Sequence, residues 1–225
     1  MSAAGARRPT RTLSEHESKR RLAAHGIPIA PERLAATPDE AARAARELGF
    51  PVAVKLCGAG LAHKTERGLV RLGIADEAGA RAAAVDLLAA ARPADGAEGV
   101  LVARMVRGTR ELIAGCVEDP TFGRCVMLGI GGVLAEALGD VTFRLVPLAR
   151  ADAEDMLDDL RHRRLLDAFR GEPAVDRARL VDVLVGLGDL VAGDPGVVAV
   201  DVNPLIVVDG VPTAVDALVE VAADA

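Results

Sequence analysis

The pattern of apolar and polar positions predicts strands and helices mixed along the first half of the chain. Short apolar runs rich in β-branched residues predict strands that begin at Val52, at Leu69 and at Gly99. Helices are predicted before and after these strands. Each begins at a Ser, Thr or Asp residue that can cap the first turn of a helix. These helices are expected from the capping box at 14–17 to about residue 25, from 37 to 49, and from 76 to about 92.

The second half continues this mixture and ends in strands. Strands are expected at residues 111–117, 124–130 and 142–147, and helices at 151–160, 163–169 and 175–191. The last stretch predicts strands at 197–202 and 205–208, a turn at Asp209-Gly210, and a returning strand at 213–219.

This order predicts an α+β fold with two α/β lobes. We expect a disordered tail at residues 1–12, an N-terminal lobe at 13–103 and a C-terminal lobe at 104–225, with the hinge near 103–109. Sheets with helices packed on them, arranged in two lobes, place the ligand cleft between the lobes.

The stretch 52–68, VAVKLCGAGLAHKTERG, carries the first candidate chemistry. Its strand delivers Lys55 into a loop with two glycines, and His63 and Lys64 follow. A lysine that ends an apolar strand is costly without an anionic partner. Two lysines and a histidine on a Gly-rich turn indicate a polyphosphate held over a mobile loop. A solvated hairpin connection explains the stretch equally well, because neither G-x-G-x-x-G nor the P-loop pattern is present.

Asp201 and Asn203 form the second candidate site. They lie on one face of a predicted strand, because side chains alternate along a strand, and Asp216 on the returning strand is expected to lie across from Asn203. Two carboxylates and an amide oxygen are a ligand set suited to Mg²⁺. A polar-faced hairpin with Asn-Pro as a turn is the alternative.

Glu111 and the glycines at 129–132 are weaker candidates. A carboxylate at the start of a strand just after the hinge suits a ribose hydroxyl, but without other support an exposed strand-end glutamate is the favoured explanation. The glycines either let the backbone approach a ligand or form a tight bend at a sheet corner.

Composition narrows the possible functions. The chain has 225 residues, is 51% hydrophobic and carries a net charge of −6, which predicts a globular protein and argues against nucleic acid as a partner. Trp and Tyr are absent, so a nucleotide base has to lie between aliphatic side chains. No apolar run is long enough to span a membrane. Three cysteines without C-x-x-C spacing argue against zinc and disulfides, and a cytoplasmic location is expected.

Taken in order, the motifs resemble a known family. They are PVAVKL, HKT-x-x-G, VLVARMV-x-G-x-RELIAG, D-P-x-F-G, GIGGV-x-x-E, VDVNPL and AVDA, spread over residues 13–221. The set resembles the ATP-grasp β subunit of nucleoside-diphosphate-forming acyl-CoA synthetases, which are relatives of succinyl-CoA synthetase. The resemblance implies an ATP-grasp fold that binds ATP or ADP with Mg²⁺.

The same resemblance implies roles for single residues. Lys55 contacts the nucleotide phosphates, Lys64 clamps the moving phosphoryl group, and Glu111 holds the ribose. His63 is the phosphoryl acceptor, Asp201 orients a phosphohistidine, and Asn203 and Asp216 hold Mg²⁺. The adenine pocket is lined by Val102, Ala103, Arg104, Met105 and Val106. The family commonly has glutamine at the position of Ala103, so one nucleotide contact is missing here.

The resemblance also implies a partner. We expect the CoA-binding and phosphohistidine domains on a separate α subunit, with which this chain forms ATP from acyl-CoA, ADP and phosphate. Two alternatives stay open from the sequence. One is a stand-alone ATP-dependent carboxylate–amine ligase, which needs no loop histidine. The other is a non-catalytic nucleotide sensor.

Overall fold

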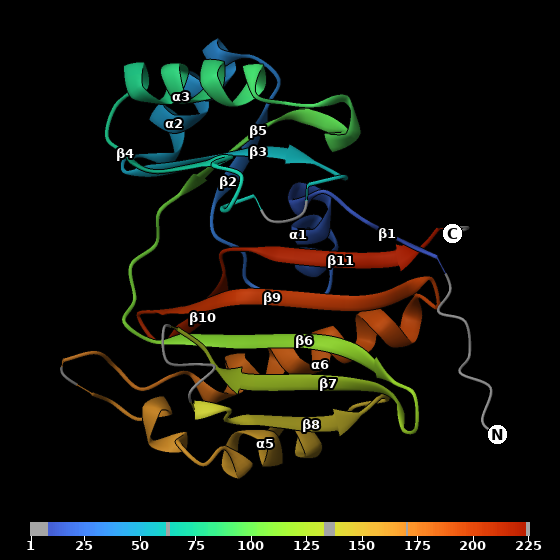
Figure 1. Ribbon diagram of the computed structural model, residues 1–225. Coiled ribbons are helices and arrows are strands. Elements are labelled where there is room, and N and C mark those ends of the chain that lie inside the picture. The colour runs from blue at the N-terminus through green and yellow to red at the C-terminus, as the bar shows by residue number, and fades with distance from the viewer. Residues whose placement is uncertain (1–8, 62–63, 133–137, 170, 224–225) are drawn as a thin grey trace.

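Two antiparallel sheets, one above the other in Figure 1, form the protein. The structure is a computed structural model, and it describes residues 9–61, 64–132, 138–169 and 171–223. Both sheets are entirely antiparallel over these residues, and helices pack on one face of each. The mixture of strands and helices expected from the sequence is therefore confirmed.

The smaller sheet has four strands in the order β2-β5-β3-β4. Its outer face is covered by α2 and α3 (Figure 1), whose buried alanines let the helices approach the sheet and each other closely. Both helices begin where the capping residues predict, at Thr37 and Asp76. The elements are β2 (Glu32–Ala35), α2 (Pro38–Leu48), β3 (Val52–Gly58), β4 (Val70–Ile74), α3 (Glu77–Ala89), the 3₁₀ turn η1 (Pro93–Asp95) and β5 (Ala97–Arg104).

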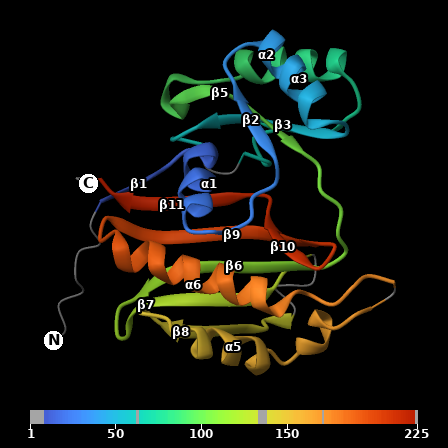
Figure 2. The same cartoon turned by 180° about the vertical axis from the view of Figure 1, so that it is seen from behind.

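The larger sheet has the order β1-β11-β9-β6-β7-β8, and β10 pairs with one end of β9. Two helices, α6 and α5, cover one face (Figure 2), while the opposite face has no helix on it in Figure 1. The elements are β6 (Glu111–Asp119), β7 (Gly123–Ile130), β8 (Val141–Leu145), α5 (Arg150–Asp159), the 3₁₀ turn η2 (Arg163–Leu166), α6 (Arg177–Gly193), β9 (Val197–Val208), β10 (Val211–Ala214) and β11 (Ala217–Ala222).

The N-terminal segment belongs to the larger sheet, although we expected it in the first lobe or in a tail. Thr10–Thr12 forms β1, which pairs with β11, so residues 10–12 are not a disordered tail. The helix α1 (Glu15–Ala24) follows, and Leu13 and Leu22 lie in the core of the larger sheet. The division at residue 103 therefore misplaces this segment. The segment is close in sequence to the smaller sheet, but burial of its leucines against β11 and α6 places it with the larger sheet.

The expected turn at Asp209-Gly210 is present and pairs β10 with β9, but the strands on either side of it differ from the prediction. β9 runs unbroken through Asn203-Pro204, where a gap between two strands is expected, and the strand expected at 213–219 is divided into β10 and β11. The pairing of β9 with β6 shifts between Leu112 and Ala114, which leaves one extra residue on β9 at this point. Such a bulge accommodates a proline, which has no N–H to donate.

One smaller difference concerns a predicted helix. The helix expected at 163–169 is only the short turn η2, Arg163–Leu166. The connection from β5 to β6, residues 105–110, joins the two sheets along the left side of Figure 1, where the hinge was expected. Among the described residues, no helix combines the length and the apolar character that a membrane crossing requires.

Candidate active site

The helix α1 lies between the two sheets (Figure 1) and carries a buried carboxylate, Glu15. Ser14 caps this helix, because its side chain accepts a hydrogen bond from the amide of Glu17. Glu15 is therefore fixed in the first turn, and only 2% of its side chain is exposed. A carboxylate this deep is stable only with cationic partners.

Three lysines supply these partners. The ammonium groups of Lys19 and Lys55 each donate to Glu15 Oε1 at 2.7 Å, and that of Lys64 donates to Oε2. Lys19 lies one turn along α1, Lys55 is the fourth residue of β3, and Lys64 follows the loop after β3. The cluster thus joins α1, which packs on the larger sheet, to the smaller sheet.

Lys19 has a second acidic partner. Its ammonium group donates to Glu32 Oε2 at 2.8 Å, and Glu32 stands on β2 in the smaller sheet. The imidazole of His16 lies 3.1 Å from the other oxygen of Glu32. Lys19 therefore holds Glu15 in place from the side away from Lys64.

Lys55 and Lys64 have their second acidic neighbour in Asp216, at the bend between β10 and β11. Lys55 Nζ lies 3.5 Å from Asp216 Oδ2, and Lys64 Nζ lies 3.7 Å from Oδ1. About 36% of the Asp216 side chain is exposed, against 6% for Lys55. The cluster therefore runs outward from the buried Glu15 to a carboxylate at the surface of the gap.

The charges of the cluster shift its acid–base equilibria. Burial alone raises the pKa of Glu15, but the three ammonium groups outweigh burial and lower the pKa far below its usual value. Burial alone lowers the pKa of Lys19 and of Lys64, but Glu15 and a second carboxylate raise both above the ordinary lysine value. All of these groups are therefore charged near neutral pH.

The predicted metal-binding residues Asp201, Asn203 and Asp216 line one cavity with Lys64. The break between β10 and β11 lies opposite the bulge in β9. There the backbone N–H of Asn203 donates to the backbone carbonyl of Asp216 at 3.3 Å. A cavity of about 380 Å³ is lined by Lys64, Asp201, Asn203 and Asp216, together with Thr12, Leu61, Thr65, Glu66, Val70, Ala217 and Leu218. Burial, then the charge of Asp216, raises the pKa of Asp201.

The two glycines after Lys55 have a different role from the one expected. A Cβ on Gly58 would lie 2.5 Å from the Asp95 carbonyl oxygen, and one on Gly60 would lie 2.2 Å from that of Ala94. Gly60 also donates to the Asp95 carbonyl at 2.9 Å. These glycines let the loop pack against η1, and no phosphate cradle is needed to explain them.

The residues expected around the adenine divide into two groups. Val102 is buried in the core under α2 and α3, directly across from Val54, so its side chain faces away from the gap. Ala103 pairs with Glu32 and Ala53 and shares the face of Lys55. The amides of Arg104 and Met105 donate to the carbonyls of Pro31 and Pro51, so neither N–H is available to a base in this arrangement.

Glu111 is the half-buried first residue of β6 and lies opposite Ile206 on β9. Its carbonyl accepts a hydrogen bond from Gly131 at 2.8 Å, so the glycines at 131–132 pack against it. Val106 lies in the connection before it. The expected phosphoryl acceptor, His63, lies outside the described residues.

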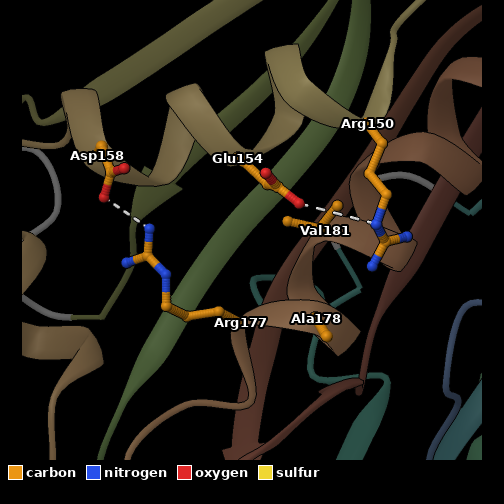
Figure 3. Close-up of a pocket in the computed structure, with 6 residues that line it drawn as sticks. All are labelled: Arg150, Glu154, Asp158, Arg177, Ala178 and Val181. Carbon is orange, nitrogen blue, oxygen red and sulfur yellow. Dashed lines mark hydrogen bonds and ion pairs between the residues drawn. The ribbon is translucent and has the colours of Figure 1, made fainter.

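A second hollow lies on the far side of the larger sheet, between α5 and α6. Figure 3 shows Arg150, Glu154, Asp158 and Arg177 along it, a volume of about 250 Å³. Its charges pair with one another: Arg177 Nη2 lies 2.6 Å from Asp158 Oδ1, and Arg150 Nε lies 3.8 Å from Glu154 Oε1. With its charges paired and largely exposed, this hollow lacks the character of a binding site.

Sequence reasoning missed Glu15, Lys19 and Glu32. The pattern around Glu15 is that of an ordinary capping box, and that prediction of a helix start is confirmed. One signal was available: the chain has 27 basic residues, and only three of them, Lys19, Lys55 and Lys64, are lysines. All three converge on one carboxylate.

This arrangement suits the binding of a polyphosphate. Two ammonium groups face the gap from the smaller sheet, and carboxylate and amide oxygens face it from the larger one. Ammonium groups are suited to phosphate oxygens, and carboxylate and amide oxygens are suited to a divalent cation that accompanies such phosphates. Lys55 lies 3.5 Å from Asp216, and Asn203 and Asp216 line one cavity with Lys64.

Comparison with known proteins supports this interpretation. Residues 4–221 match the family described as ATP-grasp domain. The acetate–CoA ligase [ADP-forming] I subunit beta of Pyrococcus furiosus is 34% identical over 215 residues, which are 94% of this chain and 93% of that protein. The 4-hydroxybutyrate–CoA ligase [ADP-forming] of Nitrosopumilus maritimus is also 34% identical, over 88% of this chain but only 29% of that protein.

A solved structure agrees with these matches. The acetyl-coenzyme A synthetase 1 of Ca. Korarchaeum cryptofilum, in complex with coenzyme A and Mg-AMPPCP, superposes with a TM-score of 0.80. It is 34% identical, and the match covers 93% of this chain and 92% of that chain. Its phosphohistidine segment is described as pointing towards the nucleotide binding site.

Proposed function

Because this chain belongs to the ATP-grasp family, in the group of β subunits of ADP-forming acetate–CoA ligases, we propose that it binds ADP or ATP between its two sheets and transfers a phosphoryl group there. The observation that carries the proposal is the convergence of Lys55 and Lys64 on the gap beside Asp216. The relatives favour this function over a stand-alone carboxylate–amine ligase or a non-catalytic sensor.

The reaction is the reversible conversion of acyl-CoA, ADP and phosphate into a carboxylic acid, CoA and ATP. Phosphate displaces CoA from the acyl-CoA to give an acyl phosphate, whose phosphoryl group then passes to a histidine and releases the acid. His63 carries the phosphoryl group on this chain and gives it to ADP. An α subunit with the CoA-binding and phosphohistidine domains is the proposed partner, which the relatives named subunit beta support.

Lys55 and Lys64 act on the phosphates. Phosphoryl transfer needs positioning and neutralisation of the charge on the transferred group, and two ammonium groups from one sheet supply both. Lys64 is the more exposed of the two and lines the cavity, so it lies nearer to an incoming phosphate. Lys55 is almost fully buried and fixes the inner end of the site.

Asn203 and Asp216 fit a magnesium ion that arrives with the nucleotide. Mg²⁺ takes one or two protein oxygens and completes its octahedron with phosphate oxygens and water. When bound, Mg²⁺ neutralises charge on the phosphates.

Asp201 is proposed to orient the phosphorylated histidine. It lines the same cavity as Lys64, and its raised pKa keeps it a good hydrogen-bond partner for an imidazole. The nucleoside is assigned to Glu111, which would accept from the ribose, and to residues 102–106. Ala103 offers its side chain to the ring, and the backbone where β5 ends, at Arg104, Met105 and Val106, is assigned to the edge of the ring.

Labelling with [γ-³²P]ATP and Mg²⁺ tests the carrier role. The complex of this chain with its α subunit is expected to gain acid-labile phosphate on this chain, and His63→Ala is expected to remove it. His25→Ala is the matched control, because His25 ends α1 with its ring against the Arg21 carbonyl. Equal labelling of the His63→Ala chain contradicts the carrier role. Absence of ATP/ADP phosphate exchange in the wild-type complex contradicts the enzyme itself.

A cytoplasmic location completes the proposal. The three cysteines, Cys57, Cys116 and Cys125, are all buried free thiols, as is usual in a reducing compartment.

A further inference from the structure

The three lysines of this chain share one acceptor, although the chain otherwise uses arginine. Of 27 basic residues, 24 are arginines, and they make the pairs at the surface. Lys19, Lys55 and Lys64 all donate to the carboxylate of Glu15. An ammonium group is compact, so three can gather around one carboxylate, whereas three planar guanidinium groups would not fit.

The contacts of Glu15 divide into an inner and an outer set. On the inner side, Lys19 is 1% exposed and links Glu15 to Glu32, so these three groups form a buried unit with a net charge of −1. On the outer side, the ammonium groups of Lys55 and Lys64 donate hydrogen bonds to Glu15 of this unit. Their other acidic neighbour, Asp216, is farther away, at 3.5 and 3.7 Å.

This division decides which contacts a phosphate replaces. A phosphate that enters the cavity meets Asp216 and Lys64 first, because both line it, whereas Glu15 does not. The weaker contacts to Asp216 are therefore exchanged for phosphate, while the contacts to Glu15 remain. Without Glu15, the two ammonium groups would repel each other and move apart.

We propose that Glu15 is the positioning residue for the two phosphate-facing lysines: it holds Lys55 and Lys64 side by side at the gap, and Lys19 with Glu32 holds it. This inference rests on the proposed function of the same site. It differs from a purely structural role because it predicts a separate effect on the rate of phosphoryl transfer. Glu15 touches neither substrate nor metal in this account.

Glu15→Gln tests the inference, because it keeps the size of the side chain and removes its charge. In the complex with the α subunit, kcat is expected to fall at least tenfold, while the Kd for Mg-ADP stays within twofold or becomes tighter, since one negative charge near the phosphates is gone. Glu15→Asp, which restores the charge, is expected to recover part of kcat. Glu17→Gln on the same helix is the control, because Glu17 pairs with Arg20 and Arg21 at the surface.

The lysines themselves give a second readout in this chain alone. Protein labelled with ¹⁵N-lysine has three side-chain ammonium signals, and Mg-ADP is expected to shift those of Lys55 and Lys64 but not that of Lys19. In Glu15→Gln, all three signals are expected to move before any ligand is added. Thermal unfolding confirms that the variant used is folded.

Each result decides between the two claims. An unchanged kcat in folded Glu15→Gln overturns the inference, and so does a tenfold loss of Mg-ADP affinity in parallel with kcat, because Glu15 would then build the binding site instead of positioning it. Failure of wild-type protein to bind Mg-ADP overturns the proposed function instead. In that case, unmoved lysine signals in ligand-free Glu15→Gln would still contradict the inference separately.

Discussion

The cluster around Glu15 and the hollow between α5 and α6 are built from the same kinds of residue. Each has acids and bases from two or more elements within ion-pair distance (Figure 3 shows the hollow). They differ in burial. Glu15 and Lys19 are almost fully enclosed, whereas Arg177 is 46% and Asp158 is 65% exposed.

That difference determines what the charges can do. In the hollow, water solvates every partner, so an ion pair there gains little and each side chain is free to leave. In the cluster, removal of Glu15 would leave three ammonium groups without the carboxylate that they share, and two of these lysines are almost fully buried. A set of cations held this firmly is prepared for an anionic ligand before the ligand arrives.

Glu15→Ala is expected to show the largest difference between the two regions. The free energy of unfolding should fall by about 3–5 kcal/mol, because three lysines lose their shared partner and two of them are nearly inaccessible to water. Urea unfolding measures this value. Glu17→Ala, in the same turn, should stay within about 1 kcal/mol of wild type, and equal losses in both variants would show that burial does not matter here.

Lys19→Met is expected to cost less, about 2 kcal/mol in the same assay. Its removal leaves Glu15 with Lys55 and Lys64, and Glu32 with His16, so neither carboxylate is left alone. A loss as large as that of Glu15→Ala would mean that Lys19, and not Glu15, is the centre of the cluster.

Low pH should remove the contribution of the Glu15 charge to the free energy of unfolding. Because the pKa of Glu15 is lower in the folded than in the unfolded chain, the unfolded chain binds the proton first as the pH falls. The stability difference between wild type and Glu15→Gln should therefore be constant from about pH 5.5 to 8 and shrink below about pH 4.5. Unfolding curves over this range measure the difference. A difference that grows as the pH falls would contradict a lowered pKa of Glu15 in the folded chain.

The smallest effect is expected in the outer hollow. Asp158→Asn removes the partner of Arg177 and should change the free energy of unfolding by less than about 1 kcal/mol. The remaining difference should vanish in 0.5 M NaCl, because salt screens exposed charges within a few ångströms. A salt-independent loss of several kcal/mol would place the hollow in the same class as the cluster.

Local patterns in the sequence predicted most of the elements. The caps at Ser14, Thr37 and Asp76 begin α1, α2 and α3, and the apolar runs form β3 to β7. The wrong predictions of elements occur where pairing between strands far apart in the sequence determines the structure. Asn203-Pro204 suggests a turn locally, but β6 on one side and β10 and β11 on the other continue β9 through it.

The site was predictable only in part for the same reason. Lys55 and Asp216 are predicted from their own segments, because a lysine in an apolar strand and an aspartate in a predicted strand are both unusual there. Glu15 needs none in its own segment, since an acid in the first turn of a helix is favourable anyway. Its role comes from groups 4, 40 and 49 residues away, which only the fold brings together.

Calorimetric titration of Mg-ADP into wild-type protein and into Lys55→Met tests the central claim most directly, with Arg177→Met in the outer hollow as the matched control. The account predicts binding to wild type and to Arg177→Met with the same Kd, and at least a tenfold weaker Kd for Lys55→Met. Equal affinity of Lys55→Met and wild type, or no binding to wild type at millimolar nucleotide, would contradict the placement of the phosphate site between the two sheets.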